Sequence, residues 1–192
     1  MKCWLLIVLT LTAKVVQAKN FKCKGEYSSS LCTISDVGPG DNNVDLDNYK
    51  NRRYQTITQL TILNSTMDDI PSISSQSSLS LHYLNCIGCG LADITKHSFT
   101  PLSQLESLNI SYGSFTKLQK NLFSQLPSLI NLNVSHGAIT QIDGAAFFNL
   151  GTLQELDLSH NSISKITSNT FSSADEFVEV KFVIQSSRYH TQ

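Results

Sequence analysis

Two cysteines separated by two residues, Cys86 and Cys89, are the first residues of this sequence whose spacing could do chemistry. A C-x-x-C pair supports thiol–disulfide exchange at an exposed helix start, and it can supply two of the four ligands of a zinc site. Neither an exposed helix start nor two further ligands can be identified around this pair. Redox or metal chemistry is therefore the weakest interpretation of the two cysteines.

Histidines and paired carboxylates are the other candidates for chemistry. His136 and His160 are 24 residues apart, with Asp157 as the one carboxylate near them, and Asp68 and Asp69 form a pair in a turn. The histidines could make a pH-sensitive contact, although ordinary surface is the preferred interpretation. The sequence contains no glycine-rich phosphate loop, no H-E-x-x-H motif and no serine with plausible His and Asp partners. We predict no enzyme activity, no catalytic residues, no cofactor and no metal site.

The sequence repeats with a period of 24 residues, as Leu81, Leu105, Leu129 and Leu153 show. This period determines where all of these side chains lie. Within each period an L-x-L stretch places two apolar side chains on one face of a strand, and later apolar residues cover the same core. Stacked copies close one another's open flanks. The residues assigned to the structural core include Leu105, Leu108, Ile110, Leu129, Leu132, Val134, Leu153, Leu156, Leu158, Phe123, Phe147 and Phe171.

The repeated pattern, from Ile57 to about Phe182, resembles the leucine-rich repeat in its extracellular 24-residue form, L-x-x-L-x-L-x-x-N-x-L with a late phenylalanine. The resemblance implies an α/β leucine-rich repeat solenoid. We expect a curved right-handed coil with a parallel β-sheet on the concave face and loops, short 3-10 turns or helical turns on the convex face. The predicted domains are a signal peptide (1–18), an N-terminal cap with a disulfide (19–56), five repeats (57–176) and a partial sixth repeat with a tail (177–192).

The repeat frame assigns Cys86 to an inward strand position and Cys89 to the place of the family's asparagine. Both side chains are expected to face the core, and buried free thiols are the preferred interpretation. A local disulfide between them stays open. The family asparagine is present only as Asn161, and Gly113 and Gly137 at equivalent places cannot bond the turn backbone through a side chain. We expect a somewhat irregular solenoid there.

The N-terminus has the features of a secretory signal peptide, with Lys2, an apolar run and the small residues Val16 and Ala18 before the cleavage site. Removing Lys2 and Lys14 from 14 basic residues leaves 12 against 15 acidic residues, a net charge of −3. This acidic balance argues against nucleic acid as a partner. We predict a secreted, extracellular protein without a membrane span.

The two ends of the repeat array call for different covers. Extracellular members of the resembling family carry a small disulfide-closed cap before the first repeat, which, with four cysteines left after the signal peptide, implies a bond between Cys23 and Cys32. After Phe182 the pattern stops without a cysteine-rich cap. Three explanations stay open for this uncapped end: the last strand is a makeshift cap, a partner or a second copy covers it, or the chain is a truncated product.

Outward-facing strand positions predict the recognition surface. The concave-face binding candidates are Tyr83, Tyr112, His136, Glu155, Asp157 and His160. Three glycosylation sequons begin at Asn64, Asn109 and Asn133, all assigned to outward strand positions. Because Asn109 and Asn133 are neighbours in one ladder, glycans there would crowd the concave centre and direct protein partners to the convex side, the flank or the ends.

The sequence thus predicts a secreted, non-catalytic module that recognises a protein ligand. The two-cysteine cap, the Asn64 to Pro71 stretch and the phenylalanine late in each repeat resemble insect secreted leucine-rich immune proteins and Toll-type receptor ectodomains. That resemblance implies a role in innate immunity or extracellular signalling. The alternatives are an extracellular-matrix or adhesion protein and an inhibitor of a secreted hydrolase.

Overall fold

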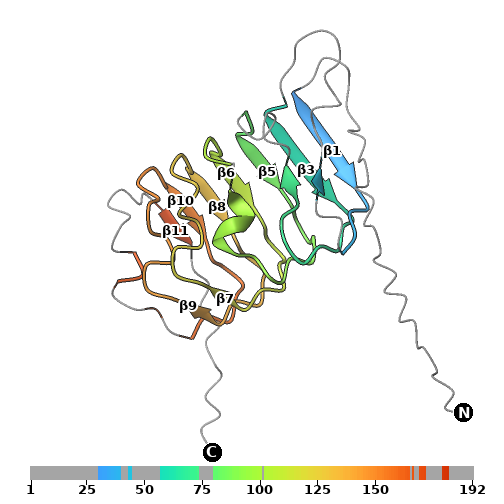
Figure 1. Cartoon of the computed structure of the whole chain (residues 1–192). Coiled ribbons are helices and arrows are strands. Elements are labelled where there is room, and N and C mark those ends of the chain that lie inside the picture. Colours follow the sequence, from blue (N-terminus) through green and yellow to red (C-terminus); the bar gives the residue numbers. More distant parts are fainter. Residues whose placement is uncertain are drawn as a thin grey trace, which may run out of the picture.

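The computed structural model describes residues 30–39, 43–44, 57–73, 80–100, 102–164, 166, 169–171 and 179–181. Its main element is a seven-stranded parallel sheet in which each strand pairs with the next copy of itself along the chain (Figure 1). The strands, in spatial order, are β1 (Leu31–Ser35), β3 (Gln59–Leu63), β5 (Tyr83–Asn85), β6 (Ser107–Asn109), β8 (Asn131–Asn133), β10 (Glu155–Asp157) and β11 (Glu179–Lys181). From β3 onward each residue pairs with the residue 24 positions later, as in Gln59 with Tyr83.

Short elements lie on the return path between the strands of the main sheet (Figure 1). Strand β2 (Asn43–Val44) pairs with β4 (Ser72–Ile73), and β7 (Lys117–Leu118) pairs with β9 (Gln141–Ile142). A 3-10 helix, η2 (Lys96–Phe99), begins with a capping box in which the Thr95 and Ser98 side chains bond each other's backbone N–H. The prediction of a parallel-sheet solenoid with short turns opposite the sheet is confirmed.

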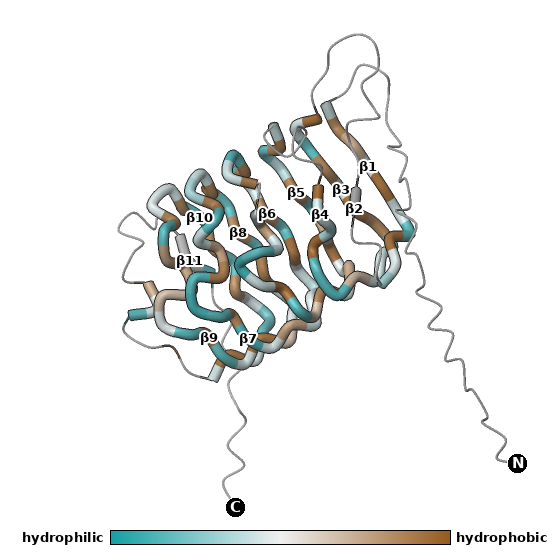
Figure 2. The backbone as a smooth tube through the Cα atoms, viewed as in Figure 1, coloured by the Kyte–Doolittle hydropathy of each residue, from teal (hydrophilic) through white to brown (hydrophobic). Residues whose placement is uncertain are grey.

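The core lies between the sheet and these return segments. Strands β5, β6, β8 and β10 each bury their central leucine, and apolar residues recur at matching places along the coil (Figure 2). The predicted core leucines, Ile110, Val134, Phe123 and Phe147 are all buried, and Phe171 is partly buried against the same core. The phenylalanines pack in a row, called the spine, with ring centroids 5.5 Å apart for Phe99 and Phe123, whose planes are tilted by 39°, and 6.1 Å for Phe123 and Phe147 and 5.4 Å for Phe147 and Phe171, whose rings are stacked. Each repeat therefore packs against its neighbours through both leucines and phenylalanines.

The turn after each of the strands β1, β3, β5, β6, β8 and β10 has a left-handed residue, and the row of these residues is called the rim ladder. Its members, Asp36, Asn64, Gly88, Tyr112, His136 and His160, have φ between 49° and 64°. Most side chains avoid this region, and Gly and Asn enter it most easily. The N–H groups of Gly88, Tyr112 and His136 donate to carbonyls of the next turn over 2.9–3.0 Å. These bonds continue the sheet ladder past the strand ends and offset the backbone strain.

The positions equivalent to the family's asparagine are filled in different ways. Ser65 accepts from Val37 N and donates to the Leu63 carbonyl, while Asn161 makes four bonds described below. At Gly137 an added Cβ would lie 2.9 Å from Asn161 Oδ1, and at Gly113 it would meet the Phe115 ring. The space of the missing side chains is thus taken by neighbours. The strand register runs unbroken across both glycines, so the expected irregularity does not extend to the sheet.

Cys86 and Cys89 are joined by a disulfide, so the preferred prediction of buried free thiols is wrong. Both residues are buried, as the repeat frame predicted, but the turn through Gly88 brings their Cα atoms to 5.6 Å, within reach of a bridge. Cys89 Sγ lies 3.7 Å from the Ile62 carbonyl oxygen. A bonded sulfur carries no proton, so this is a packing contact and not a hydrogen bond. Cys32 is also disulfide-bonded, while Cys23 lies outside the described residues, and their pairing stays a prediction.

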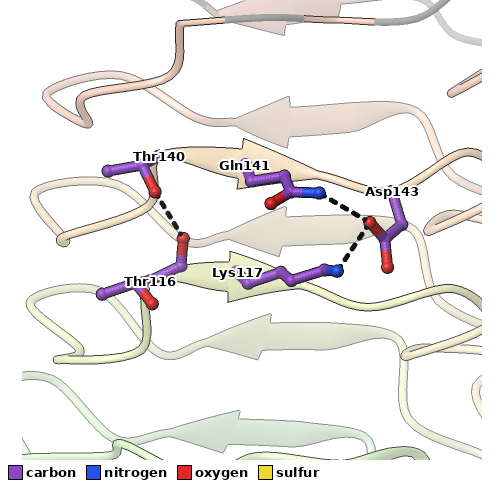
Figure 3. A network of polar contacts seen from close by, with 5 residues as sticks. All are labelled: Thr116, Lys117, Thr140, Gln141 and Asp143. Carbon is purple, nitrogen blue, oxygen red and sulfur yellow. Dashed lines mark hydrogen bonds and ion pairs between the residues drawn. The ribbon is translucent and has the colours of Figure 1, made fainter.

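A polar network stabilises the surface of the β7–β9 ribbon (Figure 3). Asp143 Oδ1 accepts from Gln141 Nε2 at 3.1 Å and lies 2.9 Å from Lys117 Nζ, and Thr140 Oγ1 donates to the Thr116 carbonyl at 3.2 Å. The residues come from adjacent repeats, so the network ties one coil to the next. The ion pair is substantially exposed to solvent, which limits its strength.

We expect Lys117→Met and Asp143→Asn each to lower the free energy of unfolding by less than about 1 kcal/mol, because exposed ion pairs are screened and entropically costly. Chemical denaturation of both single variants and the double variant gives the coupling between the two side chains, expected at about 0.5 kcal/mol or less. A coupling above about 2 kcal/mol would contradict the exposed position of the pair.

Candidate recognition surface

A polar hollow of about 440 Å³ lies on the concave face of the sheet. It is lined from β6, β8, β10 and β11 by Ser107, Leu108, Asn109, Asn131, Leu132, Asn133, Glu155, Leu156, Asp157 and Lys181. The three leucines are at most 2% exposed, because their side chains point into the core. Ser, Asn, Glu, Asp and Lys side chains therefore form the chemical surface of the hollow.

Three side chains of the hollow are fixed by the turn that follows their strand. The Oδ1 atoms of Asn109, Asn133 and Asp157 accept a hydrogen bond from the backbone N–H two residues later, at 3.1, 2.9 and 2.9 Å. Ser135 Oγ also donates to Asn133 Oδ1 at 2.7 Å. These Asx turns repeat in three successive strands. The hollow is thus preorganised, with amide groups and a carboxylate held in register.

The charges of the hollow lie at one end, on β10 and β11. Glu155 is exposed and Asp157 half-buried on β10, and Lys181 of β11 is the register partner of Asp157. The side chains toward β6 and β8 are neutral amides and a hydroxyl. A ligand in the hollow would meet two carboxylates and one ammonium group.

A stacked row of rings borders the hollow on the rim ladder. The ring centroids of Tyr112 and His136 are 4.7 Å apart with an interplanar angle of 8°, and those of His136 and His160 are 4.0 Å apart at 12°. All three side chains are exposed. The sequence placed them in one ladder, but stacking depends on the positive φ of all three residues. The row gives the concave edge a rigid, amphipathic face of the type enriched in protein interfaces.

Other predicted residues lie outside this cluster. Tyr83, a binding candidate, is exposed on β5 in the same row as Ser107 and Glu155, next to the hollow but not part of its lining. Asn85 of β5 was not among the predicted site residues. Its Oδ1 atom is buried and has no hydrogen-bond partner among the described residues. Asn109, at the equivalent position of the next repeat, accepts the Asx hydrogen bond from its turn. Because both positions hold asparagine, the sequence alone does not show that Asn85 lacks this bond.

The three sequons fall in two environments. Asn109 and Asn133 are half-buried neighbours in the hollow, as predicted. Asn64 was assigned to an outward strand position, and this is corrected by the structure: β3 ends at Leu63, and Asn64 lies in the following turn with φ 49°. The difference arises because a left-handed residue ends the alternation of the strand.

Among the described residues, no group of three or more His, Cys, Asp or Glu side chains is arranged to hold a metal ion. Within the same ranges, no helix has both the length and the apolar character needed to cross a bilayer.

Comparisons with known families give one match that agrees with the architecture and one that does not. A leucine rich repeat family profile matches residues 127–175. The profile of the helical array domain of alsin matches residues 6–120. The described part of that range contains parallel strands and a single four-residue 3-10 helix, so the second match does not represent the fold of this chain. No curated protein sequence matches the chain.

Solved structures with similar coils include three repeat proteins. The TLR13–ssRNA13 complex superposes with a TM-score of 0.56 at 20% identity, over 79% of this chain and 28% of that one. Human 5T4, a trophoblast glycoprotein, superposes with a TM-score of 0.48 at 14% identity, over 88% of this chain and 81% of that one. Toll, from the Drosophila Toll–Spatzle complex, superposes with a TM-score of 0.44 at 14% identity, over 80% of this chain and 27% of that one. This chain therefore spans less than a third of the length of the TLR13 and Toll chains that it resembles.

Proposed function

We propose that this chain, whose repeats match a leucine rich repeat profile and whose coil resembles that of the TLR13 structure, is a secreted, non-catalytic module that binds a protein ligand through its concave face. The observation that carries the proposal is the polar hollow beside the stacked rings of the rim ladder. Its Asx-bonded side chains are already ordered, which lowers the entropy cost of binding. The exposed His160 ring supplies aromatic area beside the charged end of the hollow, and the asparagines supply hydrogen bonds.

A protein ligand fits the charges of the hollow better than a nucleic acid. The TLR13 structure is that of a complex with a single-stranded RNA. In this chain the hollow presents Glu155 and Asp157 against one lysine, Lys181. Nucleic-acid binding draws its affinity from cations that neutralise phosphates, and two carboxylates oppose it. A partner surface with Lys or Arg side chains is the complementary one.

A role in innate immunity or extracellular signalling is the finer part of this proposal. It is supported by the resemblance to Toll-type ectodomains and by the coil shared with the TLR13 structure. Matrix adhesion and inhibition of a secreted hydrolase are the alternatives. Immobilised full-length protein, exposed to extracellular fluid, microbial surfaces, collagen-type fibres and secreted hydrolases, distinguishes the three by the class of partner retained.

Removing the two negative charges of the hollow is expected to weaken binding to that partner by about tenfold or more, equivalent to about 1.4 kcal/mol. The variant is Glu155→Gln with Asp157→Asn, which keeps an Oδ1 acceptor for the Ser159 N–H. Asp143→Asn on the β7–β9 ribbon is the matched control, because it removes an acidic charge far from the hollow. Titration calorimetry measures the affinity of the partner for the natural chain, the double variant and the control variant. Equal affinities would show that the partner uses another face.

A further inference from the structure

The rim ladder has a gap at Gly88, between Asn64 and Tyr112. A Cβ added to Gly88 would have nothing within 4 Å, so the space above it is open. Tyr112 stacks on His136 on the β8 side, which turns its other ring face toward Gly88, and its side chain is 53% exposed. Adjacent strands are roughly 4.8 Å apart, so Asn64 and Tyr112 enclose a space about 10 Å wide.

Apolar side chains lie beside this gap. Leu63 precedes Asn64 and is 42% exposed, and Ile87 precedes Gly88 and is 44% exposed. The equivalent residues of the next repeats are the buried serines Ser111 and Ser135. The gap therefore combines an aromatic face with two exposed aliphatic groups, a surface that gains stability when it is covered.

Asn64 is the sequon asparagine best placed for modification. Its side chain is exposed and makes no hydrogen bond among the described residues, and Thr66, the hydroxyl residue of the sequon, is exposed as well. In the other two sequons the hydroxyl residues Ser111 and Ser135 are buried, and the asparagine oxygens are bonded within Asx turns.

We propose that Asn64 carries an N-linked glycan whose first sugar lies over Gly88 and against the open face of Tyr112. The donor is a lipid-linked oligosaccharide: a bond forms between Asn64 Nδ2 and C1 of the sugar, the bond from C1 to the lipid pyrophosphate breaks, and one amide proton leaves. The C–H groups of an N-acetylglucosamine ring pack on the electron-rich ring face of Tyr112. The inference rests on the proposed secretion, since this transfer takes place in the secretory pathway.

A glycan at this place deepens the proposed function. It begins at the end of β3, while the hollow is built from β6, β8, β10 and β11. The sugar covers Leu63 and Ile87 on the rim and leaves the hollow open to a protein. The concave face and the glycan are therefore compatible in one molecule.

Mass spectrometry of the full-length chain secreted from eukaryotic cells tests the modification. Peptide N-glycosidase in heavy-oxygen water converts a glycosylated asparagine to labelled aspartate, and we expect the label at Asn64. Thr66→Ala removes the sequon without changing Asn64 and is expected to abolish this label. Ser135→Ala is the matched control, which loses the Asn133 sequon and keeps the label at Asn64.

Hydroxyl-radical footprinting tests the position of the sugar. Tyr112 has one ring face covered by His136, so covering the other is expected to slow its oxidation about twofold relative to the enzymatically deglycosylated protein. Tyr83, at the beginning of β5 while Gly88 lies in the turn after its end, serves as the unaffected reference. Thr66→Ala should behave as the deglycosylated protein does.

Each outcome decides a different part of the proposal. A chain found in the medium with unlabelled Asn64 contradicts the glycan and leaves the recognition role intact. If Asn64 is labelled but Tyr112 is oxidised equally fast in the glycosylated and deglycosylated proteins, the proposed position of the sugar over Gly88 is wrong. A chain retained inside the cell without sugars contradicts the secreted role and the glycan together.

Discussion

Phe123→Ala is expected to lower the free energy of unfolding by about 3–5 kcal/mol, the range for large aromatic truncations in well-packed cores. Phe123 is fully buried, and its ring contacts Phe99 on one side and Phe147 on the other. Removing it leaves a cavity at two repeat interfaces at once. In a solenoid the interfaces between neighbours supply much of the stability, so the loss is not confined to one repeat.

Urea denaturation followed by far-UV circular dichroism measures this loss. Phe148→Ala is the matched control, because Phe148, the residue after Phe147, is 48% exposed and its truncation should cost no more than about 0.5 kcal/mol. If Phe123→Ala does not fold, Phe123→Leu retains much of the volume and is expected to cost about 1–1.5 kcal/mol. A change below about 1 kcal/mol for Phe123→Ala would mean that the spine collapses around the cavity and contributes little.

The strands and the core were predictable from the sequence because a strand alternates its side chains and each repeat places the same residue types at the same positions. Leu108, Leu132 and Leu156 therefore had to lie side by side, and the structure pairs them. The first strand was less visible. Leu31 of β1 pairs with Gln59, a step of 28 residues, so β1 joins the sheet outside the 24-residue period.

The site was only partly predictable because its geometry depends on turns. A positive φ at Tyr112 and His136 stacks their rings, and a similar turn at Gly88 brings Cys86 next to Cys89. Periodicity states which residues are neighbours but not the backbone conformation between them. A single sequence therefore left the disulfide as one alternative, and it placed the three rings in one ladder without showing that they stack.

Asn161→Ala is expected to cost about 2–4 kcal/mol, because a buried amide with four bonds would be lost and its partners left unpaired. Asn161 is 5% exposed. The two protons of its Nδ2 are donated to the carbonyls of Val134, Leu158 and Ser159 at 2.9, 3.1 and 3.3 Å, so one proton is shared between two carbonyls. Its Oδ1 accepts from the Ile139 N–H at 3.1 Å.

The partners of this one side chain belong to two successive repeats. Ile139 and Val134 lie in the turn after β8, and Leu158 and Ser159 in the turn after β10. Alanine at this position would separate the two turns and leave the Ile139 N–H and the carbonyls of Val134 and Leu158 buried without this partner. Ser162→Ala, at an exposed neighbouring residue, is the control, expected within about 0.5 kcal/mol of the natural chain.

Gly137 provides an independent test of the same contact. An alanine Cβ there would lie 2.9 Å from Asn161 Oδ1, closer than packed atoms tolerate, so Gly137→Ala alone should destabilise the protein. In the Asn161→Ala background that clash no longer exists, and the double variant should cost less than the sum of the two single variants. Additive costs, measured by urea denaturation of all three variants, would mean that Asn161 does not occupy the space above Gly137. The missing side chain at Gly137 and the retained asparagine at Asn161 would then be unrelated, whereas coupling shows that one repeat gives up its side chain to make room for the amide of the next.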